Sequence, residues 1–107
     1  LKKNSDIKEC IHKLKQFNPN KKITVEVENI SQLKEIIDQK IEVVLLDNMS
    51  PSQVKKCIKI VNGRFECEAS GKINLKNLLS YAMTKVDRIS IGQLTHSIDN
   101  VDFGLDF

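Results

Sequence analysis

Apolar residues recur along this chain with two alternating periods. Residues 5–17 carry apolar side chains at helical spacing, which predicts a first helix. Four short runs rich in β-branched residues follow, and their starts lie 20, 22 and 23 residues apart: Ile23–Glu28, Val43–Asp47, Phe65–Ala69 and Arg88–Ile91. A stripe of helical period follows each of the first three runs. The pattern therefore predicts a helix and then repeated strand–helix units.

Capping residues support the placement of the intervening helices. Ser50-Pro51 supplies an N-cap hydroxyl before a proline, and Gln53 completes a capping box. Gly63 suits a left-handed helix end, and Asn74 is placed to cap the third helix. The three predicted stripes are Ile30, Leu33, Ile36 and Ile37, then Val54, Cys57, Ile58 and Val61, then Leu75, Leu78, Leu79 and Ala82.

The strand patterns predict a parallel sheet with one apolar face and one ionisable face. Ile23, Val25 and Val27 share one face of the first strand, whereas Glu26 lies on the other. The third and fourth strands place Glu66, Glu68 and Arg88 on that second face. A doubly wound sheet is apolar on both faces, so we expect an α/β barrel with outer helices. A complete barrel takes about eight strands and ~250 residues, so four units predict part of a TIM-like barrel.

Polar residues gather where the strands end, which is where barrel active sites lie. Glu26, Asp47 and Ser70-Gly71 occupy three such ends, and Gly92 follows the fourth strand. Asp47 is also a reasonable turn residue. Several inward carboxylates need balancing cations, whether from a metal or from basic residues of other strands. The glycines and a following helix suggest a phosphate site.

Composition and charge argue against several classes of function. The chain has 107 residues, a net charge of +3 and 40% hydrophobic residues, which fits one packed domain at most. Basic residues are scattered and do not alternate with aromatics, so nucleic-acid binding is not expected. No apolar run approaches the ~18 residues of a membrane span. Three cysteines without metal spacing, Cys10, Cys57 and Cys67, are expected to be buried, reduced thiols.

Four segments stand out at the predicted strand ends: Ile23-Thr-Val-Glu-Val-Glu-Asn29, Val44-Leu-Leu-Asp-Asn-Met49, Glu68-Ala-Ser-Gly71 and Ile91-Gly-Gln-Leu-Thr-His-Ser97. In order and spacing they resemble the quinolinate phosphoribosyltransferases. The ending Asp102-Phe-Gly-Leu-Asp-Phe107 also resembles the family's C-terminus. The resemblance implies that residues 1–107 are the C-terminal part of the barrel domain, without the N-terminal domain and first strands. Leu1 stands where an initiator Met is expected, so we expect residues before it.

The resemblance also implies an activity and a set of site residues. The reaction joins quinolinate to phosphoribosyl pyrophosphate and gives nicotinate mononucleotide, pyrophosphate and CO2, in the cytoplasm, with Mg2+ as cofactor and a homodimer as the complete enzyme. Glu26 and Asp47 would contact the ribose and the magnesium-associated part of the substrate. The implied phosphate-binding residues are Ser70, Gly71, Lys72, Ile91, Gly92 and Gln93, with His96 near the anionic ligands.

Two departures from the family pattern leave alternatives open. Lys72 replaces the second glycine of the usual Ser-Gly-Gly, and either adds a phosphate-facing cation or points outward. Lys85 stands where a glycine is usual, so that helix ending is expected to differ locally. The fragment alone is expected to be inactive. The competing interpretations are a non-catalytic phosphate- or nucleotide-binding relative and a pyrophosphorylase-like paralogue associated with molybdate transport.

Overall fold

The computed structural model describes residues 4–91 and 103–106. Its helices are α1 (Asn4–Phe17), α2 (Ile30–Ile36), α3 (Pro51–Val61) and α4 (Leu78–Ala82). Its strands are β1 (Ile23–Val27), β2 (Val43–Asp47), β3 (Glu66–Ser70), β4 (Arg88–Ile89) and β5 (Phe103–Asp106). All five strands pair in parallel within one sheet, in the order β4-β3-β2-β1-β5. The predicted alternation of strands and helices is confirmed.

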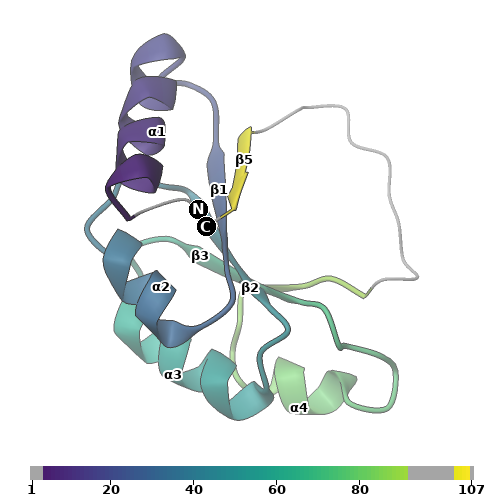
Figure 1. Ribbon diagram of the computed structural model, residues 1–107. Helices are drawn as coiled ribbons and strands as arrows, with labels where there is room; N and C mark the ends of the chain where they lie inside the picture. The colour runs from purple at the N-terminus through teal and green to yellow at the C-terminus, as the bar shows by residue number, and fades with distance from the viewer. Residues whose placement is uncertain (1–3, 92–102, 107) are drawn as a thin grey trace.

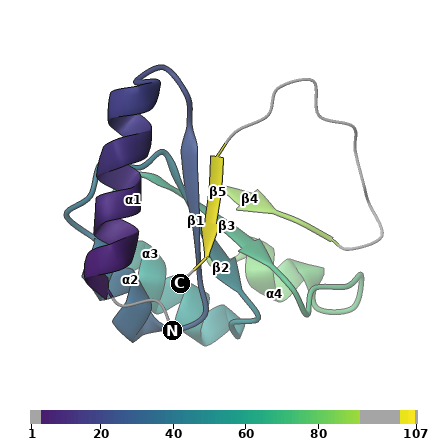
Figure 2. The same ribbon diagram turned by 45° about the horizontal axis from the view of Figure 1, so that its top comes forward.

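The helices gather on one side of the sheet. In Figures 1 and 2, α1, α2 and α3 lie together on that side, and α4 packs beside α3. Strand residues that face these helices are fully buried, as Val25, Val44 and Ala69 show. Glu26 and Glu68 on the opposite face are only partly buried. Helices on a single face are the arrangement of a barrel segment, as the strand pattern predicted.

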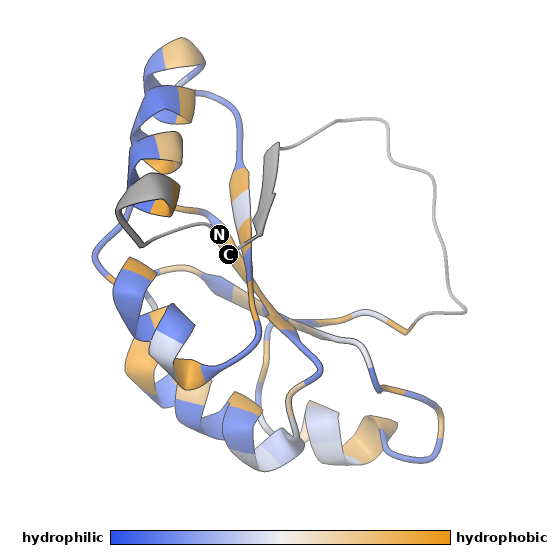
Figure 3. Cartoon of the chain, viewed as in Figure 1, coloured by the Kyte–Doolittle hydropathy of each residue, from blue (hydrophilic) through white to orange (hydrophobic). Residues whose placement is uncertain are grey.

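The hydrophobic core lies between the sheet and the helices. Figure 3 shows hydrophobic colour on the side of α1 that faces β1 and mostly hydrophilic colour on its opposite side. Fully buried helix residues include Leu33 and Ile36 of α2 and Val54 and Cys57 of α3. Each belongs to a stripe that the helical period identified. Burial of these side chains stabilises each helix far more than its intrinsic propensity does.

Helix α3 begins and ends as its sequence predicts. The Ser50 side chain accepts a hydrogen bond from the Gln53 backbone N–H, and the Gln53 side chain accepts one from the Ser50 backbone N–H. Pro51 is the first helical residue. At the other end Asn62 (φ 50°) and Gly63 (φ 79°) are both left-handed, so the reversal begins one residue before the predicted glycine.

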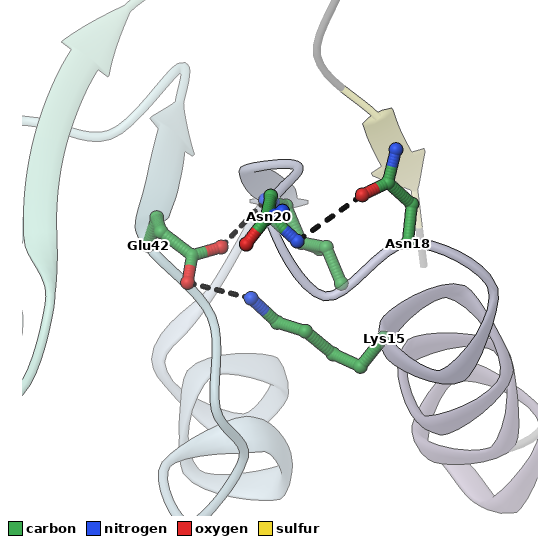
Figure 4. A network of polar contacts seen from close by, with 5 residues as sticks. Lys15, Asn18, Asn20 and Glu42 are labelled. Carbon is green, nitrogen blue, oxygen red and sulfur yellow. Dashed lines mark hydrogen bonds and ion pairs between the residues drawn. The ribbon is translucent and has the colours of Figure 1, made fainter.

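Helix α1 is attached to the sheet through Glu42, which precedes β2. One Glu42 carboxylate oxygen accepts a hydrogen bond from the Ile23 backbone N–H at 2.7 Å, and the other lies 2.6 Å from Lys15 Nζ. Figure 4 shows Glu42 and Lys15 facing each other across the gap between α1 and β2. Asn18 accepts a hydrogen bond from the Asn20 backbone N–H in the turn after α1. A single carboxylate therefore connects α1, β1 and β2.

The structure contains one strand that the hydrophobic pattern did not predict. β5 pairs in parallel with the outer edge of β1, with Phe103 opposite Ile23 and Asp106 opposite Glu26. Its run of four residues is too short to carry a clear strand period. Residues 103–106 therefore lie beside β1, the first strand along the chain (Figure 2).

The prediction of the third strand-following helix was wrong about the residue where the helix starts and about the face that it buries. α4 begins at Leu78, and the Asn74 side chain instead accepts hydrogen bonds from the Lys76 and Asn77 backbone amides in the preceding turn. Leu75 and Leu79 of the predicted stripe are 79% and 70% exposed. Tyr81 is the buried residue of this helix. The late start shifts the inward face, because the three-residue turn of residues 75–77 replaces the predicted first helical turn.

Two residues of the predicted α1 stripe also proved exposed. Phe17 ends the helix and is 81% exposed, and Cys10 is exposed, although it was expected to be a buried thiol. Ile7 and Ile11 are the buried side chains on this helix among those described. The buried stripe of α1 is therefore narrower than the sequence pattern suggested. Cys57 and Cys67 are buried and unpaired, as expected.

Lys85 has a backbone conformation that favours glycine. Its φ is 69°, in the left-handed region where a side chain costs roughly 1–2 kcal/mol. The expectation that this helix ending differs locally from the family pattern stays a prediction. The lysine adopts the left-handed turn with strain.

Candidate functional site

Acidic and hydroxyl side chains meet at the carboxyl ends of β1, β2 and β3, on the face that the helices leave open. The pairing register places Glu26 beside Leu45 and Leu45 beside Glu68. Two residues further along β2 and β3, on the same face, Asp47 lies beside Ser70. Glu26 and Asp47 are thus diagonal neighbours on one face, with Cα atoms about 8 Å apart from standard sheet geometry. The predicted convergence of these strand ends is confirmed.

The Asp47 carboxylate accepts two side-chain hydrogen bonds, one at each oxygen. Ser70 Oγ lies 3.4 Å from Oδ1, and the Asn48 side-chain amide nitrogen lies 3.2 Å from Oδ2. The Asn48 backbone N–H also donates to the Ser70 carbonyl at 3.1 Å. These contacts connect the end of β2 to the end of β3. They fix the orientation of a carboxylate that stays partly open to solvent.

Gly71 forms a tight turn directly after β3 and touches Asn48. Its φ of 98° is strained for any residue with a side chain. A Cβ at this position would also collide with Asn48, whose backbone nitrogen would lie 2.8 Å and whose Cγ would lie 2.9 Å away. Glycine is therefore required here by conformation and by space. Its exposed backbone gives an anion close access.

The loop after β2 is anchored by buried contacts with α3 and α4. Met49 is 2% exposed, and its carbonyl accepts a 2.6 Å hydrogen bond from the hydroxyl of Tyr81 on α4. Its sulfur lies 3.6 Å from the Cys57 thiol on α3. Ser50 then begins α3 through its capping box. The residues that follow Asp47 are thereby held by two helices.

Further along the open face, charges and hydroxyls are paired between β3 and β4. Arg88 forms a 2.7 Å ion pair with Glu66, and this hydrogen bond raises the pKa of the Arg88 guanidinium above its ordinary value. Ser90 Oγ donates to Glu68 at 2.8 Å. Arg88 is the inward cation that the sequence predicted. Its positive charge balances the carboxylate of Glu66, while Glu68 accepts a hydrogen bond from the hydroxyl of Ser90.

The remaining predicted residues differ in their placement. Lys72 is exposed, and its backbone carbonyl accepts a hydrogen bond from the Asn77 side chain at 2.8 Å. Ile91 is partly buried against the core. Gly92, Gln93 and His96 lie outside the described residues. The sequence placed Asn48 with Asp47 at the end of the second strand but gave it no role, and it gave no role to Tyr81.

Metal and membrane features are limited in the part of the chain that the structure describes. Residues 4–91 and 103–106 contain no cluster of three or more His, Cys, Asp or Glu side chains arranged to hold a metal ion. Among the same residues, no helix has the length and apolar character needed to cross a membrane.

Comparisons with known proteins match this chain to a single family over nearly its whole length. The family model described as quinolinate phosphoribosyl transferase, C-terminal domain, matches residues 2–106. A probable nicotinate-nucleotide pyrophosphorylase [carboxylating] of Methanocaldococcus jannaschii is 38% identical over 94% of this chain and 38% of its own length. The corresponding probable enzyme of Bacillus subtilis is 38% identical over 78% of this chain and 29% of its own.

Solved structures of enzymes with the same name also superpose on this chain. The nicotinate-nucleotide pyrophosphorylase of Francisella tularensis superposes with a TM-score of 0.78 and 34% identity, over 90% of this chain and 35% of that one. The Ehrlichia chaffeensis enzyme gives a TM-score of 0.74 and 40% identity, over 94% of this chain and 39% of that one. The chain thus spans well under half the length of these relatives. It belongs to the quinolinate phosphoribosyltransferase C-terminal domain family, with the strand-end cluster of Glu26, Asp47, Ser70 and Gly71 at the edge where barrel enzymes bind substrate.

Proposed function

We propose that this chain supplies the C-terminal part of the barrel of a quinolinate phosphoribosyltransferase. The complete enzyme would convert quinolinate and phosphoribosyl pyrophosphate to nicotinate mononucleotide, pyrophosphate and CO2. The observation that carries the proposal is the convergence of Asp47, Ser70 and the Gly71 turn at one edge of the sheet, within a chain that matches this family over residues 2–106.

The two carboxylates suit the charge that develops during glycosyl transfer. When the bond between the ribose and pyrophosphate breaks, positive charge develops on the sugar. Glu26 on β1 and Asp47 on β2 point to the same open face and offer negative charge there. Ser70 and Asn48 hold the Asp47 carboxylate in place, so little reorganisation is needed during the reaction.

The turn after β3 suits the 5′-phosphate of the sugar. Ser70 offers a hydroxyl, and Gly71 lets the backbone approach an anion without a side chain in the way. Lys72 directly follows this turn and is exposed, and we propose that its ammonium group adds positive charge for the phosphate. Gly92, Gln93 and His96 would complete the phosphate region, as the family resemblance implies.

Magnesium fits the donor chemistry at this edge. Mg2+ prefers oxygen ligands and is commonly held by one or two carboxylates together with substrate phosphates. Glu26 and Asp47 are the carboxylates that would hold it, directly or through water, and the pyrophosphate of the substrate would supply further oxygens. When bound, the ion neutralises charge on the leaving pyrophosphate.

Other parts of the site would come from the rest of the polypeptide. Quinolinate is a dianion and needs cationic groups around it. Among the described residues, Arg88 is already paired with Glu66. We expect the N-terminal domain and earlier barrel strands to supply arginines and lysines for quinolinate. A cytoplasmic homodimer is the expected form of the complete enzyme.

The test is formation of nicotinate mononucleotide by a polypeptide of family length that carries this chain. Substituting Glu26→Gln or Asp47→Asn should lower kcat/KM by about 100-fold, the size expected when a stabilising charge is removed. Glu66→Gln is the matched control, because Glu66 lies on the same sheet face at the other end of β3 and pairs with Arg88. Equal losses in all three variants, or no turnover by the unsubstituted polypeptide, would overturn the proposal.

A further inference from the structure

Asn48 has an unusual backbone conformation at the centre of the candidate site. Its φ is 57°, in the left-handed region that residues with side chains rarely adopt. The other described non-glycine residues with positive φ are Asn62 and Lys85, and both follow helices, where a left-handed residue commonly ends the helix. Asn48 instead follows strand β2, so helix termination does not explain its conformation.

The contacts of Asn48 supply a reason for this conformation. Its side-chain amide nitrogen donates to Asp47 Oδ2 at 3.2 Å, and its backbone N–H donates to the Ser70 carbonyl at 3.1 Å. Its side-chain amide oxygen lies against Gly71, in the space that a Cβ on Gly71 would occupy. One residue therefore touches the acid at the end of β2 and the turn at the end of β3.

We propose that Asn48 is a positioning residue that locks the Asp47 carboxylate and the Gly71 turn into one arrangement for binding the phosphoribosyl group. This inference rests on the proposed function, since it assigns Asp47 and Gly71 to the same substrate. Asn48 supplies the donor at one carboxylate oxygen while Ser70 supplies the donor at the other. The left-handed backbone is what directs the Asn48 amide back toward Asp47.

Substrate kinetics test the positioning role in the family-length polypeptide. Asn48→Gly keeps the left-handed backbone without strain but removes the amide. We expect KM for phosphoribosyl pyrophosphate to rise about tenfold, in line with loss of a hydrogen bond to a charged group, while KM for quinolinate stays within twofold. Asn62→Gly is the control, because Asn62 has the same conformation at the end of α3 and should change neither KM. A merely structural role would reduce the active fraction without separating the two KM values.

A double-mutant cycle tests the contact independently of activity. Gly71→Ala places a Cβ against the Asn48 side chain, and Asn48→Gly removes the colliding Oδ1 and Cγ atoms. The double variant should therefore lose less thermal stability than the two single variants together, by at least about 2 °C in Tm. Additive losses, or an unchanged KM for phosphoribosyl pyrophosphate in an active Asn48→Gly enzyme, would overturn the inference. Non-additive losses in a protein without turnover would instead refute the proposed function and retain the contact.

Discussion

Tyr81 is the residue whose removal should best reveal how the loop after β2 is held. Its ring is buried, with 4% exposure, and its hydroxyl donates to the Met49 carbonyl at 2.6 Å. Tyr81→Phe keeps the ring in place and deletes the hydroxyl alone. The Met49 carbonyl would then lose its side-chain donor in a residue that is only 2% exposed.

The expected cost follows from that unsatisfied carbonyl. Removing one partner of a buried hydrogen bond costs roughly 1–3 kcal/mol, because the remaining group stays desolvated. Urea unfolding of the purified variant should therefore show a free energy of unfolding lower by that amount, with an unchanged m-value. Backbone amides of residues 47–50 should also exchange hydrogen faster, since this loop loses its contact with α4.

The neighbouring hydroxyl on the same helix supplies the control. Ser80 is exposed, so Ser80→Ala should change the free energy of unfolding by less than about 0.5 kcal/mol. If Tyr81→Phe also stayed within 0.5 kcal/mol of the unsubstituted protein, the hydroxyl would not be anchoring Met49. The account of a loop fixed through α4 would then be refuted.

Three further predictions concern the core, a strained turn and the thiols. Leu33→Ala should lower the free energy of unfolding by about 2–5 kcal/mol, because Leu33 is fully buried, and a loss below 1 kcal/mol in urea unfolding would contradict that packing. Lys85→Gly should raise it by roughly 0.5–1 kcal/mol by relieving the left-handed backbone, and thermal unfolding that shows a loss would contradict the φ of 69°. Burial raises the pKa of the Cys57 thiol to about 11 and that of Cys67 to about 12, so iodoacetamide at pH 8 should modify Cys10 alone, as mass spectrometry can show. Because these raised pKa values exceed the ordinary value of 9.0, the contribution of the two thiols to stability is complete below pH 9. It is lost as the pH rises through about 11 for Cys57 and about 12 for Cys67.

The sequence predicted the sheet more accurately than the ends of its helices. A strand period of two is strict, so Ile23, Val25 and Val27 had to share one face, and they are all fully buried. The turn of residues 75–77 lacks such a strict rule. Asn74 and Asn77 both carry a side chain able to cap, and local hydrogen bonds of Asn74 to the turn delayed the start of α4. The resulting shift exposed Leu79 and buried Tyr81.

The sequence predicted where the candidate site lies, but it predicted fewer of the contacts between the residues of the site. Parallel strands end at one edge, so Asp47 and Ser70 were expected together, and they share a hydrogen bond. The contact between Asn48 and Gly71 depends on two positive φ angles, which a sequence pattern does not specify for asparagine. Strand β5 was missed because its pairing with β1 joins segments about 80 residues apart, and local periodicity carries no such information.

Release of CO2 from carboxyl-labelled quinolinate tests the central claim most directly. The assay needs a polypeptide of family length that carries this chain, with and without phosphoribosyl pyrophosphate, and its Asp47→Asn variant. The account predicts release that requires phosphoribosyl pyrophosphate and falls about 100-fold in the variant. No release from the unsubstituted polypeptide, or equal release from both proteins, would contradict the assignment of Asp47 and its neighbours to a phosphoribosyltransferase site.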